Sequence, residues 1–188
     1  MRVEQQASFT DYGEYLESLD MHAVILPFEP IYMSRIAQLT NKSNQFNLTT
    51  KRYTQAEIEK AAEDINQITL YGKLEDKFGD NGVVSVIIGH IEEKEYRALH
   101  IDLWLMSCRV LKRDMEYAMM DKLTETCRAQ DILYIYGYYI PTAKNGMVKN
   151  FYQLQGFEKI DDKNGNTVWR FMISKDYKLK NKHISVNK

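Results

Sequence analysis

The chain has 188 residues, of which 44% are hydrophobic and 27% charged, and its formal net charge is -1. This composition is typical of a globular domain, the lack of an apolar run of roughly 18 to 20 residues excludes a membrane-spanning helix, and the near-neutral charge excludes a global attraction to nucleic acid. The two cysteines are too few for a disulfide framework and show no zinc-ligand spacing, so we expect a cytoplasmic protein with reduced thiols and no metal.

The N-terminal third of the chain predicts mainly helix. Residues 1–20 are acidic and predict a helical linker tail, and residues 23–28 predict a short apolar strand. An amphipathic pattern predicts a helix over residues 31–41, and residues 44–50 break its period as a loop. A capping box at residues 54–57 then opens a second helix.

From residue 68 onward the pattern is mainly that of strands. The remaining elements are predicted in this order: strands at 69–75, 83–88 and 98–107, a helix at 114–129, a strand at 132–140, a short helix at 147–155, and a β-hairpin of strands 157–160 and 167–173. This order predicts an α/β fold, an α+β sandwich with a central mixed β-sheet flanked by helices. We expect one domain over residues 20–175 and a basic, solvated tail over residues 176–188.

The strand at residues 98–107 alternates along its length. Because successive side chains of a strand point to opposite faces, the alternation predicts one apolar face made of Leu99, Ile101, Leu103 and Leu105. The opposite face is then predicted to carry Ala98, His100, Asp102, Trp104 and Met106.

Cys108 follows this strand directly and is the strongest candidate for chemistry. Arg109, Lys112 and Arg113 surround it in sequence, and a helical pattern begins near Asp114. Nearby cations and the positive end of a helix both favour the thiolate form of a cysteine, so Cys108 is a candidate nucleophile. The alternative is that Cys108 packs as a small hydrophobe.

A base for this thiol is not supplied by the same strand. Eight residues of strand separate His100 from Cys108 by about 26 Å, and six separate Asp102 by about 20 Å. Neither reaches the thiol, so a general base must come from another segment of the chain. Asp80 is a candidate in one turn, and Lys144 or Asn145 in another.

Several further polar residues are candidates for binding, and each has an alternative structural interpretation. Cys127 lies on the apolar stripe of a predicted helix and is expected in the core. The amide-rich cluster after the first helix either satisfies the end of that helix or binds substrate. Lys51 and Arg52 either recognise a phosphate or an acidic carrier protein, or form a solvated pair. The amide-rich cluster consists of Lys42, Asn44, Gln45 and Asn47.

Two resemblances connect these residues to known families. Residues 151–157, Phe-Tyr-Gln-Leu-Gln-Gly-Phe, are similar to the end of many GNAT (N-acetyltransferase) domains. Four ordered blocks, at residues 38–50, 76–82, 104–110 and 141–145, resemble the C-terminal domain of FkbH-like proteins, which load glyceryl units onto acyl carrier proteins in polyketide biosynthesis.

The FkbH-like resemblance implies a GNAT-like fold and an acyltransferase that uses a cysteine thioester. Cys108 would carry a glyceryl-like acyl group to the phosphopantetheine thiol of an acyl carrier protein. Substrate contacts would come from the amide-rich cluster and from Thr142, Lys144 and Asn145. Full members also carry a haloacid-dehalogenase-like phosphatase domain, whose aspartate motif this sequence lacks, so we expect only the acyl-transfer half.

The GNAT resemblance also implies a phosphate-binding loop after the long central strand. In that family the loop reads Gln/Arg-x-x-Gly-x-Gly/Ala, and here it aligns with residues 109–114. Lys112 and Asp114 stand at the two glycine positions. Arg109, Lys112 and Arg113 would hold the phosphate of coenzyme A or of a phosphopantetheine arm. Two alternatives remain: an acetyl-CoA-dependent N-acetyltransferase with a structural Cys108, and a non-catalytic module that docks a carrier protein.

Overall fold

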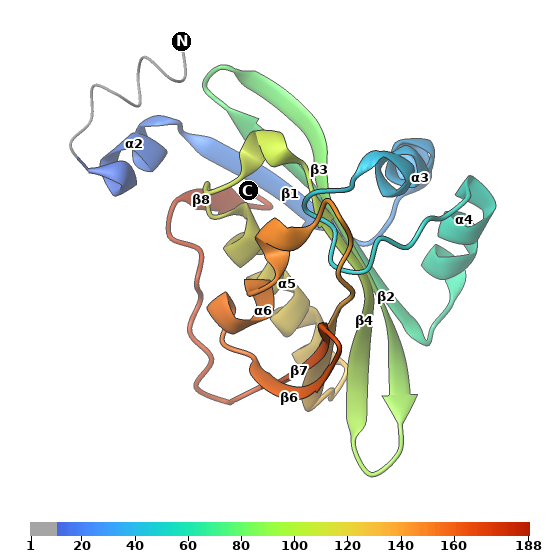
Figure 1. Ribbon diagram of the computed structural model, residues 1–188. Coiled ribbons are helices and arrows are strands. Elements are labelled where there is room, and N and C mark those ends of the chain that lie inside the picture. The colour runs from blue at the N-terminus through green and yellow to red at the C-terminus, as the bar shows by residue number, and fades with distance from the viewer. Residues whose placement is uncertain (1–10) are drawn as a thin grey trace.

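The computed structural model describes residues 11–188, and its centre is an eight-stranded mixed sheet in the order β6-β7-β5-β4-β3-β2-β1-β8 (Figure 1). The pairs β1/β8 and β4/β5 are parallel, and the other neighbours are antiparallel. The strands are β1 Met21–Leu26, β2 Gln67–Asp76, β3 Gly79–Glu93, β4 Arg97–Met106, β5 Tyr134–Tyr139, β6 Glu158–Lys163, β7 Asn166–Met172 and β8 Ile184–Val186.

Helices cover both faces of this sheet. Helices α3 and α4 pack on one face, and α2, α5 and α6 pack on the other, each against its own apolar cluster (Figure 1). The described helices are α2 Tyr12–Ser18, α3 Met33–Lys42, α4 Gln55–Glu63, α5 Met115–Ala129 and α6 Phe151–Leu154, with short 3-10 turns η1 Pro30–Tyr32, η2 Cys108–Val110 and η3 Gly146–Val148. The predicted mixed sheet with flanking helices is confirmed. Residues 1–10 of the predicted linker tail lie outside the described residues.

The side-chain alternation predicted for β4 is interrupted by a bulge. Ile88 of β3 pairs with Leu103, whereas the next residue, Gly89, pairs with Ile101, so Asp102 is an extra residue in β4. An extra residue shifts the faces of every residue after it by one. The residues on the α5 side are therefore Leu99, Ile101, Trp104 and Met106. Leu103 and Leu105 pack on the α3/α4 side instead, which corrects the predicted faces.

Strands β4 and β5 separate soon after they begin, and another part of the chain fills the gap. Their pairing runs only from Ala98 to His100 on β4. Beyond it, the backbone of residues 46–48 inserts: Leu48 N donates to Trp104 O at 3.2 Å, Met106 N donates to Phe46 O at 3.1 Å, and Ile140 N donates to Leu48 O at 2.9 Å. The inserted segment satisfies backbone groups that would otherwise be buried without partners.

Two fully buried asparagines hold this inserted segment in place. Asn145 Nδ2 donates to Asn47 O at 3.0 Å and to Ile140 O at 2.9 Å, and its Oδ1 accepts from Thr142 N at 2.8 Å. Asn47 Nδ2 donates to Ser43 O, and its Oδ1 accepts from the backbone of residue 50. Both side chains are 0% exposed. Both side chains therefore position the backbone of this segment, whereas the sequence predicts that they contact substrate.

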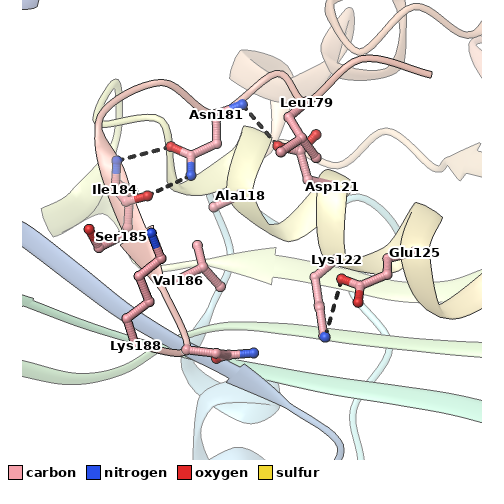
Figure 2. Close-up of a pocket in the computed structure, with 11 residues that line it drawn as sticks. Ala118, Asp121, Lys122, Glu125, Leu179, Asn181, Ile184, Ser185, Val186 and Lys188 are labelled. Atoms are coloured by element: carbon pink, nitrogen blue, oxygen red, sulfur yellow. Dashed lines mark hydrogen bonds and ion pairs between the residues drawn. The ribbon is translucent and has the colours of Figure 1, made fainter. Parts of the chain in front are cut away.

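The C-terminal segment is folded onto the domain. Strand β8 pairs with β1, and buried Asp121 of α5 accepts hydrogen bonds from Tyr177 Oη at 2.6 Å, Lys180 N at 2.9 Å and Asn181 N at 2.9 Å. Figure 2 shows Asn181 bridging Asp121 and Ile184 beside α5. The predicted solvated tail is therefore wrong for these residues, because a buried carboxylate needs the donors that this segment supplies.

Replacing Asp121 with alanine is expected to lower the free energy of unfolding by about 3 kcal/mol, because it leaves buried donors unpaired. Urea denaturation measures this loss. Glu125→Ala is the matched control on the same helix, since Glu125 forms an ion pair with Lys122 at 3.3 Å and its side chain is 71% exposed. This control should cost less than about 0.5 kcal/mol. Equal losses in the two variants would contradict the role of Asp121.

Asn145→Ala is expected to release the inserted segment and to cost about 3 kcal/mol of stability. In hydrogen exchange, the Leu48 amide should lose more protection than the amide of Ile87, which lies in the central strand β3. Lys144→Ala, at the exposed neighbouring position, is the control and should leave both amides protected. A parallel loss at Leu48 and Ile87 would show that Asn145 stabilises the whole domain without holding this segment.

Candidate active site around Cys108

Cys108 lies at a surface cavity of about 430 Å³ that draws on three separate parts of the chain. The lining residues are 42–46, from the last residue of α3 into the following loop, Met106 and Cys108 at the end of β4, and Lys144 after β5. Five residues predicted from sequence therefore meet here: Lys42, Asn44, Gln45, Lys144 and Cys108. Sequence reasoning missed Ser43, Phe46 and Met106, although each is within two residues of a predicted one in the chain.

The thiol of Cys108 is exposed and has one direct side-chain partner. Cys108 is the first residue of the 3-10 turn η2, and Ser107 caps this turn. The Cys108 Sγ lies 3.2 Å from Gln45 Oε1, to which it donates. Cys127, by contrast, is fully buried, and burial raises the pKa of its thiol. Of the two thiols, only that of Cys108 is exposed to solvent.

The charge around the cavity is positive. Lys42 and Lys144 both line it, and among the described lining residues none is acidic. Such a wall favours an anionic ligand. These two lysines replace the three cations that the sequence places beside the thiol.

Two of those three cations are held by other contacts of the fold. Arg113 forms an ion pair of 3.1 Å with Asp76, whose side chain is 0% exposed. Arg109 donates to Asn81 O of β3 at 3.3 Å. Helix α5 begins only at Met115, so its N-terminus is seven residues beyond Cys108. The predicted activation of the thiol by Arg113 and by a following helix is therefore corrected.

Asp80 does not join the Cys108 cavity. Its carboxylate accepts from Gly82 N at 2.7 Å and lies 3.5 Å from Lys73 Nζ. It lines a different cavity, next to Glu75 of β2. The structure therefore separates Asp80 from the thiol for which it was a candidate base.

Two other predicted residues stabilise chain turns. Thr142 Oγ1 accepts from Lys144 N and Asn145 N, both at 3.2 Å, which closes the turn after β5. Arg52 donates to Ser43 O at 2.8 Å and also contacts Asn44 Oδ1. It thus covers the carbonyl end of α3, where a cation is favoured by the helix dipole. This contact assigns Arg52 to the helix end in preference to a free phosphate.

The loop between β4 and α5 keeps an unusual backbone conformation at its two expected glycine positions. Lys112 has φ of +59° and Asp114 has φ of +69°, a left-handed region that costs non-glycine residues about 1–2 kcal/mol. Asp114 Oδ2 accepts from Lys182 N at 3.2 Å, so its carboxylate is directed toward the C-terminal segment. The sequence contains a signal for these two positive φ angles, because Lys112 and Asp114 align with the two glycine positions of the GNAT loop.

A smaller, mainly apolar cavity of about 190 Å³ adjoins this loop and shares Phe46 and Met106 with the Cys108 cavity. Lys112 and Gln155 also line it. Gln155 is 1% exposed, yet its Oε1 has no hydrogen-bond partner. Glu116 Oε2 is likewise buried without a partner, and burial raises the pKa of that carboxyl.

These features fit the arm of coenzyme A or of a carrier protein. A phosphopantetheine arm combines short apolar stretches, amide N–H donors and a phosphate. The apolar walls, the unpartnered Gln155 oxygen and the Lys112 ammonium match these three parts in turn.

Over residues 11–188, no group of three or more His, Cys, Asp or Glu side chains is arranged to hold a metal ion. None of the described helices is long and apolar enough to cross a membrane.

Comparison with known proteins identifies the fold. No family model matches the sequence, and no curated protein matches it. The structure resembles NAA60 of Arabidopsis thaliana in complex with acetyl-CoA, at a TM-score of 0.62 and 12% identity over 80% of this chain and 98% of that one. It also resembles spermidine N-acetyltransferase from Vibrio cholerae in complex with CoA and spermine, at a TM-score of 0.59 and 13% identity over 82% and 97%.

A third similar structure is an acetyltransferase of the GNAT family from Streptococcus pneumoniae. Its TM-score is 0.58, with 14% identity over 81% of this chain and 100% of that chain. At these identities the likeness concerns the arrangement of the elements in space. The chain has the fold of the GNAT acetyltransferases.

Proposed function

We propose that this protein is an acyltransferase that carries an acyl group on Cys108 and passes it to a phosphopantetheine thiol. The observation that carries the proposal is the exposed Cys108 thiol in a cavity with two lysines and a glutamine at 3.2 Å. The GNAT fold of similar acetyltransferases supports acyl transfer in general. The FkbH-like resemblance of residues 38–50, 76–82, 104–110 and 141–145 supports the glyceryl-like acyl group and the carrier protein.

The proposed reaction has two acyl-transfer steps. In the first, Cys108 Sγ attacks the acyl carbonyl carbon, a thioester forms, and the proton of the thiol leaves with the group that the acyl carbon releases. In the second, the thiol of the carrier arm attacks the same carbon, the bond to Sγ breaks, and the proton of the arm thiol returns to Cys108. No oxidant or reductant is needed.

The residues around Cys108 have distinct proposed roles. Lys42 and Lys144 attract a donor that carries negative charge. Gln45 holds the resting thiol through its Oε1. Its amide N–H donors are proposed to stabilise the oxyanion of the tetrahedral intermediate, an effect typically worth about 10²–10³ in rate.

The carrier arm is proposed to bind at the apolar cavity beside Lys112. This cavity meets the Cys108 cavity at Phe46 and Met106, so an arm bound there would have its thiol end near Cys108. Gln155 Oε1 would accept an amide N–H of the arm, and Lys112 would pair with its phosphate. The proposed partner is an acyl carrier protein. A haloacid-dehalogenase-like phosphatase domain, of the kind that FkbH-like proteins carry, is a second proposed partner.

A second candidate function is N-acetylation with acetyl-CoA, in which Cys108 has no covalent role. The left-handed Lys112 and Asp114 favour it, because they keep the backbone of a GNAT phosphate loop without its glycines. The two functions differ in whether an acyl group ever resides on Cys108.

Incubation with acyl donors is expected to add one acyl mass to the intact protein, detected by mass spectrometry. Glyceryl thioesters on a carrier protein and acetyl-CoA are the donors to compare. Cys108→Ser should abolish the adduct, and Cys127→Ala, which replaces the buried thiol, should keep it. Full acetyl-CoA turnover by Cys108→Ser, with no adduct on the unmodified protein, would contradict the covalent route and support the second candidate.

A further inference from the structure

A second large cavity, of about 480 Å³, lies far from Cys108 on the face of the sheet opposite α5. Leu99, Ile101 and Ile135 pack toward α5, so the alternating residues His100 and Tyr136 face the other side. Figure 1 shows the β3–β4 hairpin projecting beyond α3 and α4, which leaves this end of the sheet uncovered. Six residues of β4 separate His100 from Met106 at the Cys108 cavity, about 20 Å of strand.

Two of the lining residues, His100 and Tyr136, belong to a stack of rings. The imidazole of His100 stacks on Tyr136 at a centroid distance of 4.8 Å and 8° between planes, and on His90 at 5.1 Å and 13°. Tyr138 Oη lies 2.6 Å from His100 Nδ1. These contacts fix the rings before any ligand arrives, which lowers the entropy cost of binding.

The walls of the cavity are acidic. Glu92 and Glu95 come from the β3–β4 hairpin, and Asp161 comes from β6 on the opposite wall. Lys94 is the one cation among the described lining residues, and its side chain is 79% exposed where it pairs with Glu92 at 2.7 Å. Glu95 raises the pKa of Tyr96, and burial lowers the pKa of His100, which favours its neutral form.

One tyrosine ring beside this cavity already holds a cation on its face. The guanidinium carbon of Arg170 lies 5.3 Å from the centroid of the Tyr134 ring, in the same tyrosine row of β5 as Tyr136. An aromatic floor with carboxylates on facing walls is the chemistry that recognises guanidinium and ammonium groups. In the free protein Glu92 pairs with Lys94 at 2.7 Å and Asp161 lies 3.9 Å from Lys163 Nζ, so a bound cation would compete with these two lysines.

We propose that this cavity binds a small organic cation, with its guanidinium or ammonium group over Tyr136 and between Glu92 and Asp161. The volume is that of a site for one small molecule. The proposal does not depend on the function of Cys108, because the two cavities share no lining residue. Lys94 forms an ion pair with Glu92 in the free protein, so it competes with the ligand for this carboxylate.

The test uses butylguanidinium and its neutral analogue butylurea, which have nearly the same shape, in isothermal titration calorimetry of the full chain. Butylguanidinium should bind saturably at low ionic strength and more weakly as salt rises, and butylurea should not bind. The double variant Glu92→Gln/Asp161→Asn should weaken butylguanidinium at least tenfold, and Lys94→Ala should tighten it. Glu125→Gln, which removes one carboxylate charge from α5, outside this cavity, should leave its affinity unchanged.

Three results would overturn the proposal. These are no saturable butylguanidinium binding below about 10 mM, equal binding of butylurea, or an unchanged affinity in the Glu92/Asp161 double variant. Acetyl-Gly-Arg-Gly-amide is the second probe. Binding of this peptide without binding of butylguanidinium would also contradict a small-molecule site and would indicate recognition of a protein segment.

Discussion

The early separation of β4 from β5 is the constraint on which the candidate site depends. Parallel strands that diverge leave backbone groups on their facing edges, and inside a domain these groups need partners. Here residues 46–48 supply them, held by the buried amide of Asn145. The same insertion brings Gln45 to 3.2 Å from Cys108 and puts Lys42 and Lys144 on one cavity. A requirement of the sheet thus assembles residues from three distant parts of the chain.

The same insertion affects how a donor or carrier arm reaches the site. The backbone groups of Trp104 and Met106 in the gap are already hydrogen-bonded to the inserted segment. The apolar cavity between α5 and α6 stays open beside them, with the unpartnered oxygen of Gln155. The left-handed conformations of Lys112 and Asp114 cost stability without glycine. They persist because Asp76 holds Arg113 between them and the C-terminal segment holds Asp114.

The sequence predicts most of the elements and the mixed sheet, because hydrophobic periodicity records which face of each element is buried. It does not predict the bulge at Asp102. Apolar residues occupy both faces of β4 from Leu103 onward, so a one-residue shift of the faces does not change the pattern of apolar and polar residues. The pair of Asp76 and Arg113 is 37 residues apart in the chain and has no local signal. The sequence predicts Asn47 and Asn145 as ligand contacts, because it does not show whether an asparagine side chain is buried or exposed. In the structure both are buried.

The central claim is that the insertion held by Asn145 builds a cationic cavity around Cys108. The most direct measurement compares alkylation of Cys108 by anionic iodoacetate and by neutral iodoacetamide, with N-acetylcysteine as the free-thiol reference. In the unmodified protein, Lys42 and Lys144 should raise the ratio of the iodoacetate rate to the iodoacetamide rate above that reference. In folded Asn145→Ala the ratio should fall toward the reference value. A ratio that is the same in both proteins would contradict the account.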